Sequence, residues 1–291
     1  MNQTKQSAIF RFILRTCAFV TFAIIAGLVI YIFAKGAMYI HPSLFSLHYT
    51  SENASLFPAL VNTAIVLVVS LVMAVPVGVG AAIYLAEYAK SGNRFVRVIR
   101  ITAETLTGIP SIVYGLFGLL LFVTALKWQF SLLAGCCTLA IMILPVIMRT
   151  SEEALLSVPM TYREASFGLG AGKLRTVFKT VLPVAIPGIV NGIVLSVGRI
   201  IGETAALLYT AGTVAHIPNN LMGSGRTLAV HLYSLWCEGL RTEQAYATAV
   251  VLVLFVVVLN FISGKIEKTM TKRQGYLHIW RSKPTKSRLK K

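Results

Sequence analysis

"PVAIPGIVNGIVLSVGRIIGETAALLYTAG", residues 183–212, is an apolar run that carries only two charged side chains, Arg199 and Glu203. About 20 mostly apolar residues cross a bilayer as one helix, so this run is long enough to span a membrane. A charged side chain at the bilayer centre costs about 2.5–3.5 kcal/mol on insertion scales. The run therefore predicts a membrane-spanning helix in which two charged groups serve a purpose.

Similar apolar runs occur along the whole chain. Of its 291 residues, 56% are hydrophobic and 13% are charged, whereas soluble domains contain about 25% charged residues. The first run follows Arg11 and Arg15, as the core of a signal peptide would, but its length and the lack of a small-residue cleavage site favour an uncleaved span. We predict an all-α integral membrane protein with about six transmembrane helices, at residues 8–34, 58–86, 101–126, 131–148, 183–212 and 246–263.

The net charge of +17 would suit nucleic-acid binding, but its distribution has another explanation. If the amino terminus is cytoplasmic and the chain crosses the membrane six times, 22 of the 27 Lys and Arg residues lie on the cytoplasmic side. This asymmetry is typical of membrane proteins, and it predicts that both termini are cytoplasmic. We expect contact with the lipid bilayer and none with nucleic acid. The basic end of the chain is expected to lie on the anionic inner leaflet or to be solvated and disordered.

No pattern in the chain indicates an enzyme. "GLGAGKLRT" resembles a phosphate-binding loop, but the Walker pattern requires Gly at the position of Phe167. The five histidines are scattered over predicted loops and the tail, and the four cysteines lack metal-ligand spacing, so they are expected to be free thiols. We therefore expect no catalytic residue, no metal and no cofactor.

Three stretches carry local signals. Residues 101–126 are polar for a span, and Pro110 is expected to kink the helix there. "RTLAVHLYSLWCEGL" in the last external segment can form an interfacial or partly inserted helix. The run at 183–212 contains two glycine pairs with four-residue spacing, which allow helix backbones to approach closely: Gly188 with Gly192, and Gly198 with Gly202.

The cytoplasmic segment between the fourth and fifth runs contains "EASFGLG", followed nine residues later by "TVLP". This arrangement resembles the EAA loop of ABC-importer permeases. Ser166 and Thr180 depart from the family pattern, and the matching positions are Glu164, Ala165, Gly170, Leu182 and Pro183. The resemblance implies that a short helix docks on a separate ATPase subunit, and it assigns Arg163, Glu164, Ala165 and Gly170 to this coupling. Gly170 would let the chain turn back.

Longer stretches narrow the resemblance to one branch of this family. "TAETLTGIPSIVYGLFG", "SEEALLSVP", "YREASFGLGAGK" and "GRIIGETAALLYTAG" are similar to the permease subunits of phosphate-specific importers, and most of all to the PstA type. The resemblance covers about residues 58–263 and implies a MetI-like permease core there, with its coupling loop at about 150–183. Outside this core we predict a first span and external loop at 1–57 and a basic cytoplasmic tail at 264–291.

The resemblance also implies a set of partners in a bacterial inner membrane. These are a second permease (PstC-like), a dimer of ATPase subunits (PstB-like) and a periplasmic phosphate-binding protein (PstS-like), with inorganic phosphate as the substrate. ATP hydrolysis would belong to the separate ATPase subunit.

Arg199 and Glu203 are four residues apart, so one continuous helix would place them on one face, close enough to pair. Three interpretations remain open: a structural ion pair, a proton relay, and a substrate path, which we favour because the arginine fork suits phosphate oxygens. Glu203 would then hold the guanidinium when no anion is bound. Thr204 would provide a further polar side chain along this path, and so would Thr210 and Thr213. Glu104 is a second lining candidate, or alternatively a partner for a basic residue of the other permease.

Other transport classes also fit parts of the sequence. Molybdate or sulfate would suit a lone arginine as well as phosphate does. A secondary anion transporter would need inverted repeats, which the two halves of the chain do not show. A structural or regulatory membrane protein would need neither two charges within a span nor an ATPase-docking loop.

Overall fold

The computed structural model describes residues 3–50, 53–90, 92–239 and 241–281. Within these ranges the regular elements are helices, and no strand occurs. The α-helices are α1 (Gln3–Gly36), α2 (Phe57–Ile83), α3 (Arg94–Thr107), α4 (Ser111–Gly118), α5 (Leu132–Leu156), α6 (Met160–Gly168), α7 (Lys173–Thr176), α8 (Leu182–Ile201), α9 (Ala205–Leu208), α10 (Leu228–Glu238) and α11 (Thr242–Arg281). Two 3₁₀ turns follow α1, and π-helical segments follow α2, α4 and α7: Ala37–Tyr39, Pro42–Phe45, Tyr84–Tyr88, Leu119–Ala125 and Val177–Val181.

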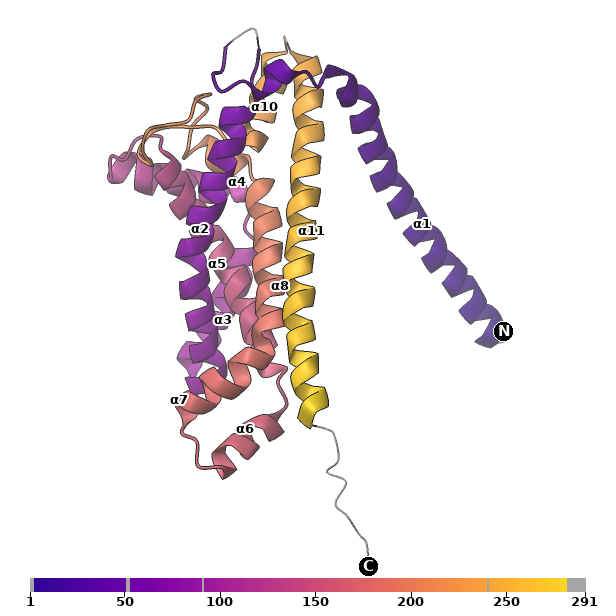
Figure 1. Cartoon of the computed structure of the whole chain (residues 1–291), viewed down its shortest axis with the longest axis vertical. Helices are drawn as coiled ribbons and strands as arrows, with labels where there is room; N and C mark the ends of the chain where they lie inside the picture. Colours follow the sequence, from indigo (N-terminus) through magenta and orange to yellow (C-terminus); the bar gives the residue numbers. More distant parts are fainter. Residues whose placement is uncertain (1–2, 51–52, 91, 240, 282–291) are drawn as a thin grey trace, which may run out of the picture.

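The number of spans agrees with the sequence prediction. In the described part of the chain, 5 helices are long and apolar enough to cross a membrane, or 6 when the bent pair α3–α4 is one span. α10 lies where an external or partly inserted helix is expected, at the opposite end of the bundle from α6 and α7 (Figure 1). The prediction of an all-α membrane protein with about six spans is confirmed.

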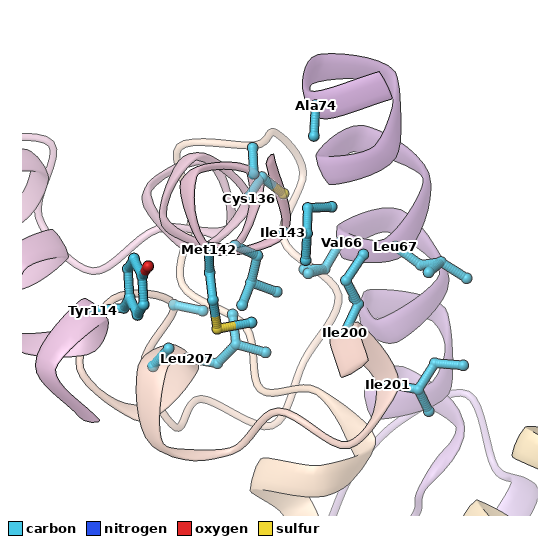
Figure 2. Close-up of a cluster of buried hydrophobic side chains, with 14 of the residues drawn as sticks. Val66, Leu67, Ala74, Tyr114, Cys136, Met142, Ile143, Ile200, Ile201 and Leu207 are labelled. Carbon is cyan, nitrogen blue, oxygen red and sulfur yellow. The ribbon is translucent and has the colours of Figure 1, made fainter. Parts of the chain in front are cut away.

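α5 is the central helix of the bundle. In its most apolar window 72% of the residues are buried, against 28% in α2 and in α11. α2 and α8 both pack on α5 (Figure 1). Figure 2 shows this core, in which Val66 of α2, Ile143 of α5 and Ile200 of α8 come together. The Ser70 hydroxyl adds a polar link by donating to the carbonyl oxygen of Cys136, at 3.2 Å.

α1 leans away from the other helices in Figure 1, and none of its apolar window is buried. It meets α11 near its C-terminal end, where the rings of Tyr31 and Tyr246 pack edge to face with centroids 6.2 Å apart. A Cβ added at Gly36 would lie 2.6 Å from a methyl carbon of Val250, so the two helices approach most closely there. An exposed helix with an apolar window of this length is suited to lipid on its free face.

The break expected at Pro110 is confirmed, but it is larger than a kink. α3 and α4 meet at 103° around Gly108–Pro110, so residues 101–126 do not form one straight span. Proline cannot donate its backbone nitrogen and disfavours a helical residue before it, which ends α3. The Tyr114 hydroxyl donates to the carbonyl oxygen of Leu106 at 2.8 Å and so partly compensates for the interrupted helix.

The predicted span at 183–212 is wrong at both ends. On the cytoplasmic side, α7, a π-helical turn and α8 form one apolar helical stretch, Lys173–Ile201. On the other side α8 ends at Ile201, and residues 202–212 form a turn, the short helix α9 and a further turn. Hydropathy alone does not detect this end, because the residues after it are also apolar.

The C-terminal basic segment begins as helix. α11 continues to Arg281, at the end of the bundle that carries α6 and α7 (Figure 1). The expectation of a disordered tail is therefore wrong for residues 264–281, and the rest of the tail, 282–291, lies outside the described residues. The cysteines among the described residues are free, and Cys136 and Cys137 are buried as expected.

One of the two glycine pairs in α8 makes a close contact. A Cβ added at Gly188 would lie 2.6 Å from Cβ of Ala154, and one at Gly192 would lie 2.8 Å from Cβ of Thr150, both on α5. At Gly198 no atom lies within 4 Å of such a Cβ. The first pair therefore sets the α5–α8 separation, and the second pair does not.

We expect Gly192→Ala to lower the thermal midpoint of the purified protein, because α5 must move away and overpacking typically costs about 1–3 kcal/mol. Gly198→Ala is the matched control on the same helix and should leave the midpoint unchanged or slightly raised. The measurement is a thermal unfolding curve in detergent. Equal midpoints for the two variants would show that the α5–α8 contact tolerates a methyl group.

Candidate translocation and coupling sites

Arg199 lies in the last turn of α8, and its side chain is half-buried. The C-terminal end of a helix stabilises a positive charge by about 0.3–1 kcal/mol at exposed positions. Tyr114 of α4 lies close enough for an electrostatic interaction with the guanidinium. Arg199 forms no ion pair with any carboxylate of the described residues. Its charge is therefore available to an anion.

Glu203 is buried just beyond the end of α8, with 7% of its surface exposed. Its carboxylate accepts a hydrogen bond from the backbone nitrogen of Ala206 at 3.0 Å and so caps α9. The predicted Arg199–Glu203 pair is therefore wrong. Side chains four residues apart lie close together only when both belong to one continuous helix. α8 ends at Ile201, between Arg199 and Glu203, so this condition is not met.

Thr204 lines a cavity of about 650 Å³ between α1, α9, α10 and α11, whose other walls are mostly apolar and aromatic. Arg199, Glu203 and Glu104 do not line this cavity. The Thr210 hydroxyl is buried and donates to the carbonyl oxygen of Ala206 at 2.7 Å, so it is not free for a substrate. The four predicted path residues are thus not gathered in one pocket of this conformation.

Glu104 lies on the exposed side of α3 and is paired within the chain. Its carboxylate is 3.2 Å from Nη1 of Arg149, whose Nε also donates to Glu153 at 3.1 Å. All three side chains are about half exposed or more, so solvent screens these pairs and they contribute little to stability. The structure shows no contact between Glu104 and Arg199 among its hydrogen bonds and ion pairs.

The EAA segment forms the helix–turn–helix that its sequence predicts. Glu164 and Ala165 lie exposed on α6. Gly170 has φ +78°, a left-handed conformation that side chains rarely adopt, and it directs the chain towards α7. The predicted turn at Gly170 is confirmed. Ser166, which departs from the family pattern, bonds to the Thr176 hydroxyl at 2.9 Å and so links α6 to α7.

Arg163 is buried, so any part that it has in coupling is not a direct contact of its side chain with a docked protein. Its Nη2 lies 2.5 Å from Oε1 of Glu87, and the exposed fractions of the two side chains are 10% and 7%. Its remaining donors bond to the carbonyl oxygens of Val158 at 2.8 Å and Leu155 at 3.0 Å. Arg163 therefore fastens α6 both to the end of α5 and to the π-helical turn after α2.

Sequence reasoning missed three partners in this region. Glu87 directly follows the apolar run at 58–86, and an isolated carboxylate at such a boundary is itself a signal of a basic partner. Glu152 pairs with Arg100 at 2.6 Å and is 8% exposed, which joins α5 to α3. The ammonium of Lys173 lies 5.0 Å from the ring centre of Tyr88, at the same junction as Glu87. These contacts together fix the coupling segment against α2, α3 and α5.

We expect Arg163→Leu to destabilise the protein strongly, because it leaves Glu87 buried without a partner, and breaking a buried pair costs about 3–5 kcal/mol. The double change Arg163→Leu with Glu87→Leu removes both charges and should recover much of the thermal midpoint. Unfolding curves of the single, double and wild-type proteins measure this. A double variant no more stable than the single would contradict the pairing as the source of the effect.

The chain is similar to known transport proteins. Residues 74–272 match the family described as "Binding-protein-dependent transport system inner membrane component". A protein of Bacillus subtilis named "Probable ABC transporter permease protein YqgI" is 35% identical over 267 residues, which cover 84% of this chain and 89% of that protein. "Phosphate transport system permease protein PstA 1" of Mycobacterium tuberculosis is 36% identical over 223 residues, which cover 75% of this chain and 72% of that protein.

Solved structures share the fold at lower identity. An inward-facing structure of the MetNI methionine ABC transporter matches with a TM-score of 0.57 at 23% identity, over 74% of this chain and 94% of that chain. A structure of a bacterial alginate ABC transporter matches with a TM-score of 0.67 at 15% identity, over 92% of this chain and 96% of that chain. In that structure the transporter is in complex with a periplasmic protein that has bound an alginate pentasaccharide. The helical membrane fold, the coupling segment and these similarities agree: the chain belongs to the family of binding-protein-dependent transport system inner membrane components, and it is an ABC-transporter permease rather than an enzyme.

Proposed function

We propose that this chain is the subunit through which an ATP-driven importer moves inorganic phosphate across a bacterial inner membrane. It works with a second permease (PstC-like), a dimer of ATPase subunits (PstB-like) and a periplasmic phosphate-binding protein (PstS-like). Relatives that are named as phosphate transport permeases support this substrate. They are about as similar to this chain as the Bacillus subtilis permease is.

The observation that carries the proposal is Arg199. It is a half-buried cation in a membrane-spanning segment, with no acidic partner among the described residues. An arginine presents a planar fork of donors that matches two oxygens of a phosphate group. Glu203 is occupied at the start of α9, so the anion would not have to displace a carboxylate from Arg199.

The coupling route follows from helix continuity. α6 and the residue that follows it carry an exposed apolar surface in the cytoplasmic loop: Met160 is 60% exposed and Leu169 is 88% exposed. This surface, together with the exposed Glu164 and Ala165, suits docking on the ATPase. Arg163 attaches α6 to the bundle. α7 then continues into α8 without a break up to Ile201, so a movement of α6 and α7 reaches Arg199 along one stiff element.

The substrate role of Arg199 is tested in vesicles that contain the whole complex. Arg199→Lys keeps the charge but loses the fork, so uptake of radiolabelled phosphate should fall at least about tenfold, equivalent to about 1.4 kcal/mol. The yield of assembled complex should stay near the wild-type value, because Arg199 holds no partner helix through an ion pair. Lys127→Gln, an exposed external lysine, is the control for loss of a positive charge.

The competing interpretations give different results in the same assay. Normal phosphate uptake by Arg199→Lys and by Arg199→Gln would end the substrate-path proposal. ATP-dependent uptake of sulfate or molybdate in place of phosphate would assign the chain to another oxyanion. Uptake that needs no ATPase subunit would favour a secondary transporter.

Docking of the ATPase on α6 is tested by co-purification. Leu169→Asp and Glu164→Lys change exposed side chains, so each should reduce recovery of the ATPase several-fold while the thermal midpoint of the permease is unchanged. Lys90→Gln, an exposed cytoplasmic residue outside α6, should recover the ATPase normally. Full ATPase recovery with both α6 variants would place the docking surface elsewhere.

A further inference from the structure

Arg226 is a buried cation at the opposite end of the molecule from the coupling segment. It precedes α10, and only 4% of its surface is exposed. Its backbone is fixed on both sides, since its nitrogen donates to Val214 at 2.9 Å and its carbonyl accepts from Nδ2 of Asn62 at 3.2 Å. Its guanidinium lies 4.7 Å from the ring centre of Tyr49. The side chain is therefore held in one place.

The guanidinium lacks hydrogen-bond partners. Its Nε and Nη2 are buried and bond to no atom of the described residues. His231 lies nearby and is fully buried, and burial together with the charge of Arg226 lowers the pKa of this histidine to about 3. The imidazole is thus neutral at physiological pH, and it offers no negative charge. No ion pair joins Arg226 to a carboxylate in the described part of the chain.

Arg226 lines a cleft of about 310 Å³. Thr213, Tyr233 and Ser234, which carry hydroxyl groups, line the same cleft, together with Cys237 and Glu238. One water occupies about 30 Å³, so the cleft has room for a small anion with part of its hydration shell. Hydroxyls beside a guanidinium are donors of the kind that bind phosphate oxygens.

The cost of an unpaired buried charge supports a bound anion. Removing one partner of a buried pair strongly destabilises proteins, because the remaining charge is uncompensated. Here no carboxylate of the described chain pairs with Arg226, whereas Arg163 is paired with Glu87. An anion in the cleft would supply the missing negative charge.

The cleft also adjoins the cavity that contains Thr204, because Leu208 and Tyr233 line both. α10 lies at the end of the bundle opposite α6 and α7 (Figure 1), so the cleft is on the external side in the predicted topology. We propose that Arg226, with the hydroxyls of Thr213, Tyr233 and Ser234, forms an external binding site for a small tetrahedral oxyanion, which receives the anion before it reaches Arg199.

Cys237 provides a probe within the cleft. In the assembled complex with Cys17→Ala, and with Cys136 and Cys137 buried, an uncharged, membrane-impermeant maleimide added outside should label Cys237. Inorganic phosphate should slow this labelling, by about tenfold at ten times its dissociation constant, whereas chloride at equal ionic strength should not. The choice of phosphate rests on the proposed function, and sulfate is therefore tested in parallel.

Variants connect the protection to Arg226. Arg226→Gln should abolish protection, and Thr213→Glu, which places a carboxylate at an exposed position of the cleft, should abolish it without burying a new group. Arg199→Gln should keep it, because Arg199 does not line the cleft. Protection by sulfate alone would support the site and contradict phosphate as the substrate. Equal labelling rates with and without either anion, or protection only by the loaded binding protein, would overturn the proposal.

Discussion

A bilayer provides no water to backbone groups or charges, and this constraint shapes each irregular feature of the chain. A continuous helix satisfies its own backbone, so every interruption requires a local compensation. Tyr114 supplies one across the α3–α4 bend, and Glu203 supplies another at the start of α9. The first interruption lies between α3 and α4, and the second lies between α9 and α8, whose last turn carries Arg199.

The same constraint divides the arginines into two classes. Arg163 and Arg100 meet carboxylates that are themselves buried, and they hold the coupling segment and α3 against the bundle. Arg199 and Arg226 meet none among the described residues. Paired arginines stabilise the assembly of helices, and unpaired ones remain available to an anion. Of the two, Arg199 lies in the last turn of α8, and Arg226 lines the cleft beside α10.

Coupling depends on stiffness as well as on contacts. The stretch Lys173–Ile201 runs from the cytoplasmic loop to Arg199, and Gly188 and Gly192 bring it close to the central helix α5. The Arg163–Glu87 pair anchors α6 at the start of this stretch. The helical stretch is therefore continuous from α7 to Arg199, and α5 packs against α8 along it.

The sequence by itself determined the features that depend on local chemistry. Hydropathy indicated about six spans, proline located the break at Pro110, and glycine located the turn at Gly170, because each effect acts within a few residues. Only the tertiary structure decided which distant groups meet. α8 ends between Arg199 and Glu203, so the expected pair does not form. Gly192 packs closely on α5, whereas Gly198 does not. Arg163 is buried against Glu87, and Arg226 is buried against Tyr49. These contacts join residues up to 177 positions apart (Tyr49 and Arg226), and no local pattern specifies which of many possible partners a long side chain reaches in three dimensions.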